Sequence, residues 1–408
     1  MTDVERQGAG TPAGRTGPWT RRRIFQLVAT CALLGGAALV ASGLSRASRA
    51  PGAPGAPRVL YVSPAGSNSG GCTAKAPCRS LDFAYRTAPG GSTVLLRSGR
   101  YPGQWIGGEG PDRTAGRVTF RPAPGATVGF DGTIDIFDSH VELRGLRVQD
   151  VTVGDFDQTA GRPNPTDVRL IDLRGRNFQI DSATHVTVKG GSWGPASACG
   201  GPYGGTNNSI RDITGVVPSD ILIEGVAIHD VQSYDLTSCH IEGLAIFAGR
   251  RITVRGSRFY GNSIYDVFVQ ANSGPVSGLL FERNWMAMPV GLDGAENGTV
   301  IGFSAITSGV TLRDNRFNYI VSLDDDGLNP TFSGFVLSGN VGVLPYAGCS
   351  LRGIVWDHNL WRNGACSGSD VSMRGRRLPY VNGSNDGSLD YRVTRAAPAR
   401  WRRWAARH

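Results

Sequence analysis

The chain has 408 residues, a formal net charge of +9, only 18% charged residues and 58 glycines. Its length allows either two average domains or one long repeat architecture. The excess charge lies at the two ends, because residues 1–50 and 390–408 each carry about +5, which leaves about −1 for residues 51–389. A nucleic-acid-binding protein needs a basic face on its folded body, so no nucleic-acid partner is expected.

The N-terminal segment predicts a signal or membrane anchor. A basic segment (1–23) that ends in three arginines precedes 21 mostly apolar residues (24–44), enough to cross a bilayer as a helix. The arginines keep the N-terminus in the cytoplasm and place the rest of the chain outside. The apolar run exceeds that of a signal peptide and Pro51 hinders cleavage, so a single-pass cell-membrane anchor is favoured over a cleaved, secreted form.

A Pro/Gly-rich linker (45–57) follows, and then the folded body, 58–390. Its first part contains a strand in "VLYVS" (59–63) and one amphipathic helix in "RSLDFAYRTA" (79–88). The stretch "STVLLRSGRY" (92–101) returns to strand. Most later segments are short aliphatic and Thr-rich runs without a helical period, broken by Gly, Asn, Asp and Ser.

Six cysteines follow the predicted anchor, and an even number in an exported chain predicts disulfides. We expect each to pair with its neighbour in the sequence, as Cys72–Cys78, Cys199–Cys239 and Cys349–Cys366. A metal site is the alternative, but the chain has no C-x-x-C spacing among these cysteines, and no metal site is expected.

A degenerate hexapeptide recurs through the body. Its copies begin with an apolar residue, continue with a charged or polar residue and a turn former, and often place Asn fourth. The copies are "LRGLRV" (143–148), "VKGGSW" (188–193), "IEGVAI" (223–228), "VRGSRF" (254–259), "FERNWM" (281–286), "LRDNRF" (312–317), "LSGNVG" (337–342) and "WDHNLW" (356–361). Self-similarity at about 19–31 residues is typical of stacked units.

Each unit has room for three short strands and three bends, which predicts a parallel β-helix. The alternative, a β-sandwich, would show tight two-residue hairpin turns, but "NG" occurs only outside the hexapeptides. We expect Asn at the bend, because Asn tolerates left-handed backbone angles. The side chains of Asn284, Asn315, Asn340 and Asn359 should then stack as a ladder.

With these repeats, the chain resembles the pectate-lyase-like right-handed parallel β-helix proteins, exported and carbohydrate-active. The segment "LYVSPAGSNSGGCTAKAPCRSLDFAYRTAPGGSTVLLRSGRYPGQ" is similar to the N-terminal cap of that group, and "SLDYRVTRAAPARW" to its closing segment. The resemblance covers about residues 58–400. It implies an all-β solenoid with a short capping helix, and polysaccharide as the class of partner. No pectate lyase "RxPxxR" motif is present.

The densest polar stretch, 228–270, carries the candidate site. Elimination from a uronate polymer needs a base, for which His240 or Tyr265 is a candidate, and a cation, for which Arg251 or Arg255 is a candidate. His229 and Asp230 are further catalytic candidates. Hydrolysis needs two facing carboxyl groups, for which Glu242 and Asp266 are the natural pair. Further candidates for substrate binding are Arg251, Tyr265 and Lys189. The alternative is that these side chains cap corners of the coil or solvate its surface.

Two smaller features have open interpretations. The carboxylates of Asp324, Asp325 and Asp326 suit Ca²⁺, or form an exposed turn; no cofactor is otherwise expected. The tail 391–408 interleaves Trp401 and Trp404 with arginines, which suits an anionic surface or a frayed end.

The functional expectation is therefore a membrane-anchored β-helix that acts on polysaccharide, as a uronate-polymer lyase or a glycosidase. The alternative is a non-catalytic glycan-binding or cell-envelope structural protein. An aromatic strip with Phe247, Phe268 and Trp285 would serve that second function.

Overall fold

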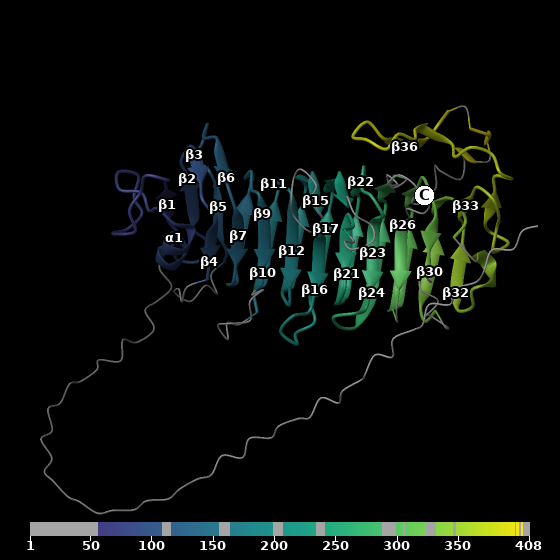
Figure 1. The fold of residues 1–408 in the computed structure, drawn as a ribbon, viewed down its shortest axis with the longest axis horizontal. Coiled ribbons are helices and arrows are strands. Elements are labelled where there is room, and N and C mark those ends of the chain that lie inside the picture. The colour runs from purple at the N-terminus through teal and green to yellow at the C-terminus, as the bar shows by residue number, and fades with distance from the viewer. Residues whose placement is uncertain are drawn as a thin grey trace, which may run out of the picture. The chain divides into compact units, whose positions relative to one another are not determined.

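The short strands of the repeat stack in parallel and close into a coil with three faces (Figure 1). The structure is a computed structural model. It describes residues 56–107, 116–154, 164–198, 207–233, 241–287, 299–304, 307–323, 332–345, 348–395, 397–399 and 401–402. Successive turns of the coil contribute their strands to three parallel sheets, which we call sheets A, B and C. This is the parallel β-helix that the resemblance implies.

Sheet A, with twelve strands, is the longest. Its strands are β1 (Val59–Val62), β2 (Thr93–Leu96), β5 (Val118–Pro122), β8 (Val141–Arg144), β10 (Thr166–Ile171), β13 (Thr184–Lys189), β17 (Ser219–Glu224), β21 (Gly249–Arg255), β24 (Val276–Glu282), β27 (Thr307–Arg313), β30 (Phe335–Ser338) and β32 (Ile354–Asp357).

Sheets B and C have nine strands each. Sheet B consists of β11 (Arg174–Gly175), β14 (Ser192–Trp193), β18 (Ala227–His229), β22 (Arg258–Tyr260), β25 (Trp285–Met286), β28 (Arg316–Phe317), β31 (Val341–Gly342), β33 (Leu360–Trp361) and β34 (Val371–Ser372). Sheet C consists of β4 (Gln104–Ile106), β7 (Thr133–Ile136), β9 (Asp150–Val153), β12 (Asn177–Asp181), β16 (Asn208–Arg211), β20 (Leu244–Ile246), β23 (Tyr265–Gln270), β26 (Thr299–Ser304) and β29 (Val321–Ser322).

Three two-stranded pairs complete the strands. They are β3 (Gly99–Tyr101) with β6 (Val128–Phe130), β15 (Ala196–Ala198) with β19 (Val231–Ser233), and β35 (Tyr380–Asn382) with β36 (Asp390–Val393). Among the pairings within the described ranges, only β35–β36 is antiparallel. A β-sandwich built from hairpins is therefore wrong for the body of this chain.

Each hexapeptide runs from the end of sheet A, around a corner, into sheet B. Its first and sixth residues face the interior, as Val188 and Trp193 do, both fully buried. Its fifth residue faces outward on sheet B. A ninth copy, "LIDLRG" (170–175), follows the same course, because Ile171 pairs with Lys189 and Arg174 with Ser192.

The left-handed residue of the corner is the third in each copy, so the prediction that Asn adopts these angles was wrong. The backbone φ is 53° at Arg283, 56° at Asp314 and 50° at His358, and glycines such as Gly256 and Gly339 occupy the same position elsewhere. The fourth residue is free to point inward because the third makes the bend.

The predicted asparagine ladder is confirmed. The Oδ1 atom of Asn315 accepts from the backbone N–H of Asn284 at 3.0 Å and from its Nδ2 at 3.0 Å. Asn340 and Asn359 repeat this pattern, and the carboxylate of Asp370 accepts from Asn359 at the end. All four asparagines are fully buried, so their side chains satisfy backbone groups that water cannot reach.

The N-terminal end of the coil carries helix α1 (Leu81–Thr87), within the stretch predicted as helix. Ser80 caps it by accepting from the N–H of Phe83, and Leu81, Ala84 and Tyr85 are buried. The predicted Cys72–Cys78 disulfide is present beside it. The Cys349–Cys366 disulfide is present near the other end, beside the 3₁₀ helix η1 (Gly348–Ser350).

The C-terminal segment, the described residues of 371–402, turns back over sheet B from β33 as far as β22 (Figure 1). Tyr380 donates from its hydroxyl to the carbonyls of Phe317 (2.8 Å) and Val341 (2.9 Å). Tyr391 stacks on Tyr380 and on Trp285. Trp285 therefore lies beneath this segment rather than in an open aromatic strip.

Several expectations fall on residues outside the described ranges. They are the basic segment and anchor (1–44), the linker up to residue 55, Cys199 and Cys239, His240, Asp324–Asp326 and Trp404. Within the described ranges, no helix is long and apolar enough to span a membrane.

Candidate functional site

The outward side chains of sheet B form columns along the coil. The fifth residues of successive hexapeptides lie in register, so Arg147 is beside Arg174, Arg174 beside Ser192, and Ser192 beside Ala227. Because neighbouring strands lie about 4.8 Å apart, successive side chains in this column are also about 4.8 Å apart. A second column, two residues further along each strand, includes His229 and Tyr260.

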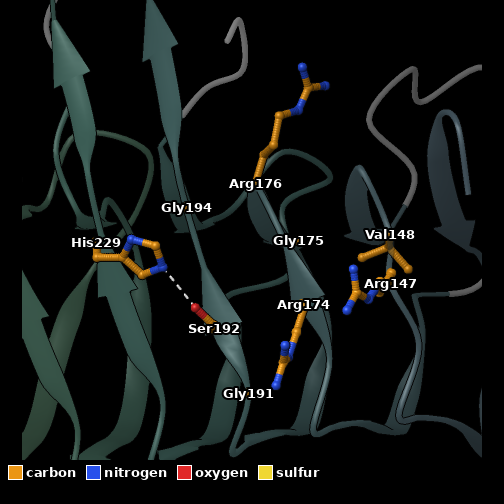
Figure 2. A pocket seen from close by; sticks show the side chains of 9 residues that line it. All are labelled: Arg147, Val148, Arg174, Gly175, Arg176, Gly191, Ser192, Gly194 and His229. Carbon is orange, nitrogen blue, oxygen red and sulfur yellow. Dashed lines mark hydrogen bonds between the residues drawn. The ribbon is translucent and has the colours of Figure 1, made fainter. Parts of the chain in front are cut away.

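A groove of about 670 Å³ lies over these columns (Figure 2), and we call it the sheet B groove. Its lining includes Arg147, Arg174, Arg176, Ser192, Gly194 and His229. A second hollow of about 530 Å³, which includes Arg100 and Gly129, shares Arg147 and Val148 with it. The two hollows therefore adjoin along sheet B, toward the N-terminal end of the coil.

Two glycines allow close packing in the strands that form the floor of the groove. A Cβ atom at Gly175 would lie 2.8 Å from the Trp193 ring and 2.9 Å from Val148. At Gly194, with φ of 133°, a Cβ atom would lie 1.7 Å from the His229 carbonyl oxygen. Larger residues cannot replace them without a shift of the strands.

The groove is strongly basic. Arg147 and Arg174 are exposed, and within the described residues neither guanidinium has an ion-pair partner. Arg176 pairs with Asp150, and Arg100 donates from Nε to Asp131 at 2.8 Å. None of the described residues that line the two hollows is acidic. Two adjacent positive charges on a concave floor attract an anionic ligand.

His229 is the middle member of a chain of three hydrogen-bonded side chains, Ser192, His229 and Asp230. Its Nε2 atom is 2.7 Å from Ser192 Oγ, and its Nδ1 atom is 2.7 Å from Asp230 Oδ2 (Figure 2 shows the first of these bonds). The imidazole stacks on the Tyr260 ring, with centroids 5.0 Å apart and planes 6° from parallel. The histidine side chain is only 15% exposed, so its position is well defined.

The two carboxyl groups proposed for hydrolysis are buried and bonded to amides. Glu242 accepts from Asn207 Nδ2 at 2.6 Å, and Asp266 accepts from Asn262 Nδ2 at 2.7 Å. Their exposures are 2% and 1%. Burial raises the pKa of Asp266 well above its ordinary value. Neither residue lines the sheet B groove.

The other predicted residues lie on sheets A and C. On sheet A, Glu224 forms ion pairs with Lys189 (Nζ to Oε2, 2.9 Å) and with Arg255 (guanidinium to Oε1, 2.8 Å). The hydrogen bond from Lys189, and to a smaller extent the one from Arg255, lowers the pKa of the Glu224 carboxyl. Arg251 pairs with Asp220, where its hydrogen bond lowers the Asp220 pKa to about 2. Tyr265 stacks on Phe268 of sheet C at 4.8 Å. Of the eight predicted site residues that lie in the described ranges, the structure places only His229 in the lining of the groove, with Asp230 hydrogen-bonded to it.

The groove also contains residues that sequence reasoning missed: Ser192, Arg147, Arg174 and Arg176. The signal was present in the fifth position of the hexapeptides, which reads Arg, Ser, Ala, Arg from the first to the fourth copy. Reading the copies as aligned columns, with the ninth copy included, would have placed Arg147, Arg174 and Ser192 side by side.

Solved structures with a similar fold share few identical residues with this chain. A pectate lyase, Pel9A, is 13% identical with a TM-score of 0.43, covering 83% of this chain and 90% of that one. A rhamnogalacturonan lyase is 12% identical with a TM-score of 0.43, covering 85% and 99%. The A-module of a mannuronan C-5 epimerase from Azotobacter vinelandii, AlgE6, is 15% identical with a TM-score of 0.34, covering 72% and 96%. These identities carry no activity or substrate over to this chain.

By sequence, the uncharacterized protein YwoF of Bacillus subtilis (strain 168) is 31% identical over 113 residues. This match spans 25% of the chain and 24% of that protein. No family model matches the chain.

Proposed function

We propose that this pectate-lyase-like parallel β-helix protein binds an anionic polysaccharide along the sheet B groove. The observation that carries the proposal is the pair Arg147 and Arg174, which lie side by side in the groove without an ion-pair partner in the described residues. Guanidinium groups bind carboxylates through paired hydrogen bonds, and an extended groove suits a polymer better than a small anion.

The shape of the groove supports a chain-like ligand. The adjoining hollows extend from Arg100 to His229, across the strands and therefore along the axis of the coil. A polymer with a negative charge on its sugars can contact Arg147 and Arg174 together and extend past Arg100. A polyuronate is the simplest such polymer.

The chemical groups in the groove bear on the two reactions expected from the sequence. Glycoside hydrolysis needs two carboxyl groups across the scissile bond, and the described residues that line the groove include none. Elimination needs a base and a cation, and here both nitrogens of His229 are already hydrogen-bonded to Ser192 and Asp230. Polysaccharide recognition is thus the function that the groove supports best, and elimination stays a prediction to be tested by ultraviolet absorbance of unsaturated products.

The test is the affinity of the full-length protein for a polyuronate and for a neutral glucan of similar length, measured by titration calorimetry. We expect binding of the polyuronate only, weakening as salt is raised. The double variant Arg147→Ala/Arg174→Ala should weaken binding by at least about tenfold for each arginine, since a hydrogen bond to a charged group contributes about 1.5–3 kcal/mol.

The matched control is Arg121→Ala/Arg169→Ala, which removes the same charge from the outward face of sheet A, where both arginines are exposed. This control should bind the polyuronate like the unmodified protein. Equal losses in the two double variants would mean that net charge, not the groove, attracts the polymer. Binding that survives the loss of Arg147 and Arg174 would contradict the proposal.

A further inference from the structure

The Ser192–His229–Asp230 chain has the arrangement of an activated nucleophile. Ser192 and His229 lie on the adjacent strands β14 and β18, and the hydroxyl and the imidazole meet across one step of the coil. Asp230 follows His229 directly and binds its other nitrogen. A nucleophile, a base and a group that orients the base are thus connected by two bonds of 2.7 Å.

Hydrogen-bond chemistry fixes the direction of the proton in this chain. An ionised carboxylate only accepts, so Nδ1 of His229 must carry the proton that it shares with Asp230. In neutral imidazole the other nitrogen, Nε2, then carries a lone pair. Ser192 Oγ must therefore donate to Nε2, which is the arrangement in which histidine can take the serine proton.

The surroundings hold Asp230 and His229 in place. Asp230 has a left-handed backbone with φ of 54°. A Cβ atom at Gly261 would lie 2.3 Å from Asp230 Oδ1, so only glycine leaves room for the carboxylate there. The Gly261 N–H in turn donates to Asn385 of the C-terminal segment at 2.8 Å.

We infer that Ser192 is the nucleophile of an ester hydrolase that removes O-acyl groups from the polysaccharide bound in the sheet B groove. Ser192 Oγ attacks the ester carbonyl while its proton moves to His229 Nε2. The bond from the acyl carbon to the sugar oxygen then breaks, and His229 returns the proton to the leaving sugar hydroxyl. Water, deprotonated by His229, attacks the acyl-serine, releases the carboxylic acid and restores the Ser192 hydroxyl. The sum is an ester and water giving an acid and an alcohol.

Arg174 is the group that would stabilise the negative oxygen formed by this attack. The backbone N–H groups of Ser192 and Gly194 already donate to the carbonyls of Leu173 and Gly175, both at 2.9 Å or less, within the β-helix ladder. Arg174 lies beside Ser192 in the same column, and its guanidinium has no ion-pair partner among the described residues. Its positive charge therefore does the work that backbone amides do in many hydrolases.

The basic floor also selects among esters. A methyl ester on a uronate removes the charge that Arg147 and Arg174 would bind, whereas an acyl group on a sugar hydroxyl leaves the carboxylate free. The substrate class is therefore an O-acylated polyuronate. This inference rests on the proposed function, because it takes the polymer to be the ligand of the groove.

The experiment measures acid release by the full-length protein from an O-acetylated polyuronate, from its methyl-esterified counterpart and from a small aryl acetate. A fluorophosphonate probe and mass spectrometry identify any serine that reacts. We expect release from the acetylated polymer, with Ser192 labelled. Ser192→Ala should lower kcat/KM about 10³-fold or more, and His229→Ala about 10²–10⁴-fold. Asp230→Asn should lower kcat with little change in KM and slow the labelling of Ser192 in parallel, because an amide can donate to Nδ1 and reverse the tautomer.

Binding of the polyuronate to Ser192→Ala separates the two proposals and also shows that this variant is folded. Normal binding without acid release or Ser192 labelling in the unmodified protein overturns the esterase and leaves the proposed function standing. Release from the aryl acetate through Ser192 without polyuronate binding overturns both the proposed ligand and the O-acylated substrate. Faster release from the methyl-esterified polymer overturns the choice of ester.

Discussion

At the scale of a single residue, the buried carboxyl group of Asp266 destabilises the folded state. Its Oδ1 atom accepts from Asn262 Nδ2, and its Oδ2 atom is buried with no hydrogen bond to the described residues. Burial raises the pKa of this carboxyl well above its ordinary value of 3.8. The folded protein therefore holds a proton that the unfolded chain has already lost, over the pH range between the two pKa values.

In that range stability should fall as pH rises, because the unfolded state binds fewer protons. The slope from this group is about 1.4 kcal/mol per pH unit, and the effect ends above the raised pKa. Asp266→Asn should remove this slope and raise the unfolding temperature at neutral pH. The measurement is thermal unfolding of both proteins from about pH 4 upward.

Asp386→Asn is the control with the opposite sign. The Ser388 hydroxyl and backbone N–H lower the pKa of this exposed carboxyl, so its contribution is present above the ordinary pKa and is lost as pH falls. This variant should give no gain in stability at neutral pH. A neutral-pH gain from Asp386→Asn as large as that from Asp266→Asn would mean that net charge, not burial, is responsible.

At the scale of the repeated element, the asparagine ladder sets the corner between sheets A and B. Asn315 bonds to the backbone N–H and side chain of Asn284, to Asn340, and from Nδ2 to the Phe281 carbonyl at 2.9 Å. Asn315→Ala leaves buried polar groups without partners on both neighbouring coils. Since each such group costs about 1–3 kcal/mol, we expect a loss of roughly 3–5 kcal/mol.

Guanidinium unfolding followed by circular dichroism measures this loss. The control is Asn272→Ala, because Asn272 is an exposed asparagine with one side-chain bond, to Gln270. It should change stability by less than about 0.5 kcal/mol. Similar effects of the two substitutions would show that the ladder contributes little.

The same element explains what the sequence could and could not predict. The hexapeptide copies predicted the coil and the ladder, because an apolar first residue and an inward Asn recur wherever a corner forms. The left-handed residue was placed one position too late, since Arg283 and His358 adopt angles that are more typical of Gly or Asn. A residue type alone does not reveal which of two adjacent positions bends.

The site was harder to predict because a coil separates chain neighbours and joins residues one turn apart. Arg255 and Asp266 are close in sequence to His229, yet Arg255 ends a sheet A strand and Asp266 lies in a sheet C strand. Ser192 lies 37 residues before His229 and is hydrogen-bonded to it. Closeness in sequence therefore did not identify the residues that meet in the groove, whereas alignment of the hexapeptide copies does.

At the scale of the whole folded body, the C-terminal segment determines how much of sheet B is open. It covers Trp285 and Arg316 and reaches Gly261, next to the corner that holds Asp230. The open part of sheet B is therefore the part with Arg147, Arg174 and Ser192. The covered part would otherwise expose the apolar side chains of Trp285, Val341 and Leu360 as one patch, and such patches favour aggregation.

Tyr391 is the residue that attaches this segment most firmly. It is fully buried and stacks on Tyr380, with centroids 4.5 Å apart, and on Trp285 at 6.1 Å. Tyr391→Ala should release residues 371–402 at a cost of about 3 kcal/mol or more, as for other large aromatic truncations. Because each coil of a solenoid contacts mainly its neighbours, the coils before β22 should stay folded.

Hydrogen exchange with mass spectrometry can locate this change along the chain. We expect faster exchange in residues 371–402 of Tyr391→Ala and unchanged protection in β5 to β18. Tyr391→Phe keeps the ring stack and loses only the hydrogen bonds of the hydroxyl group, to the Ser384 carbonyl at 3.3 Å and with the Asn318 side chain, so its exchange should match the unmodified protein. Loss of protection throughout the coil in Tyr391→Ala would instead mean that every turn depends on the C-terminal segment for its stability. The segment could then not be displaced to open more of sheet B without unfolding the coil.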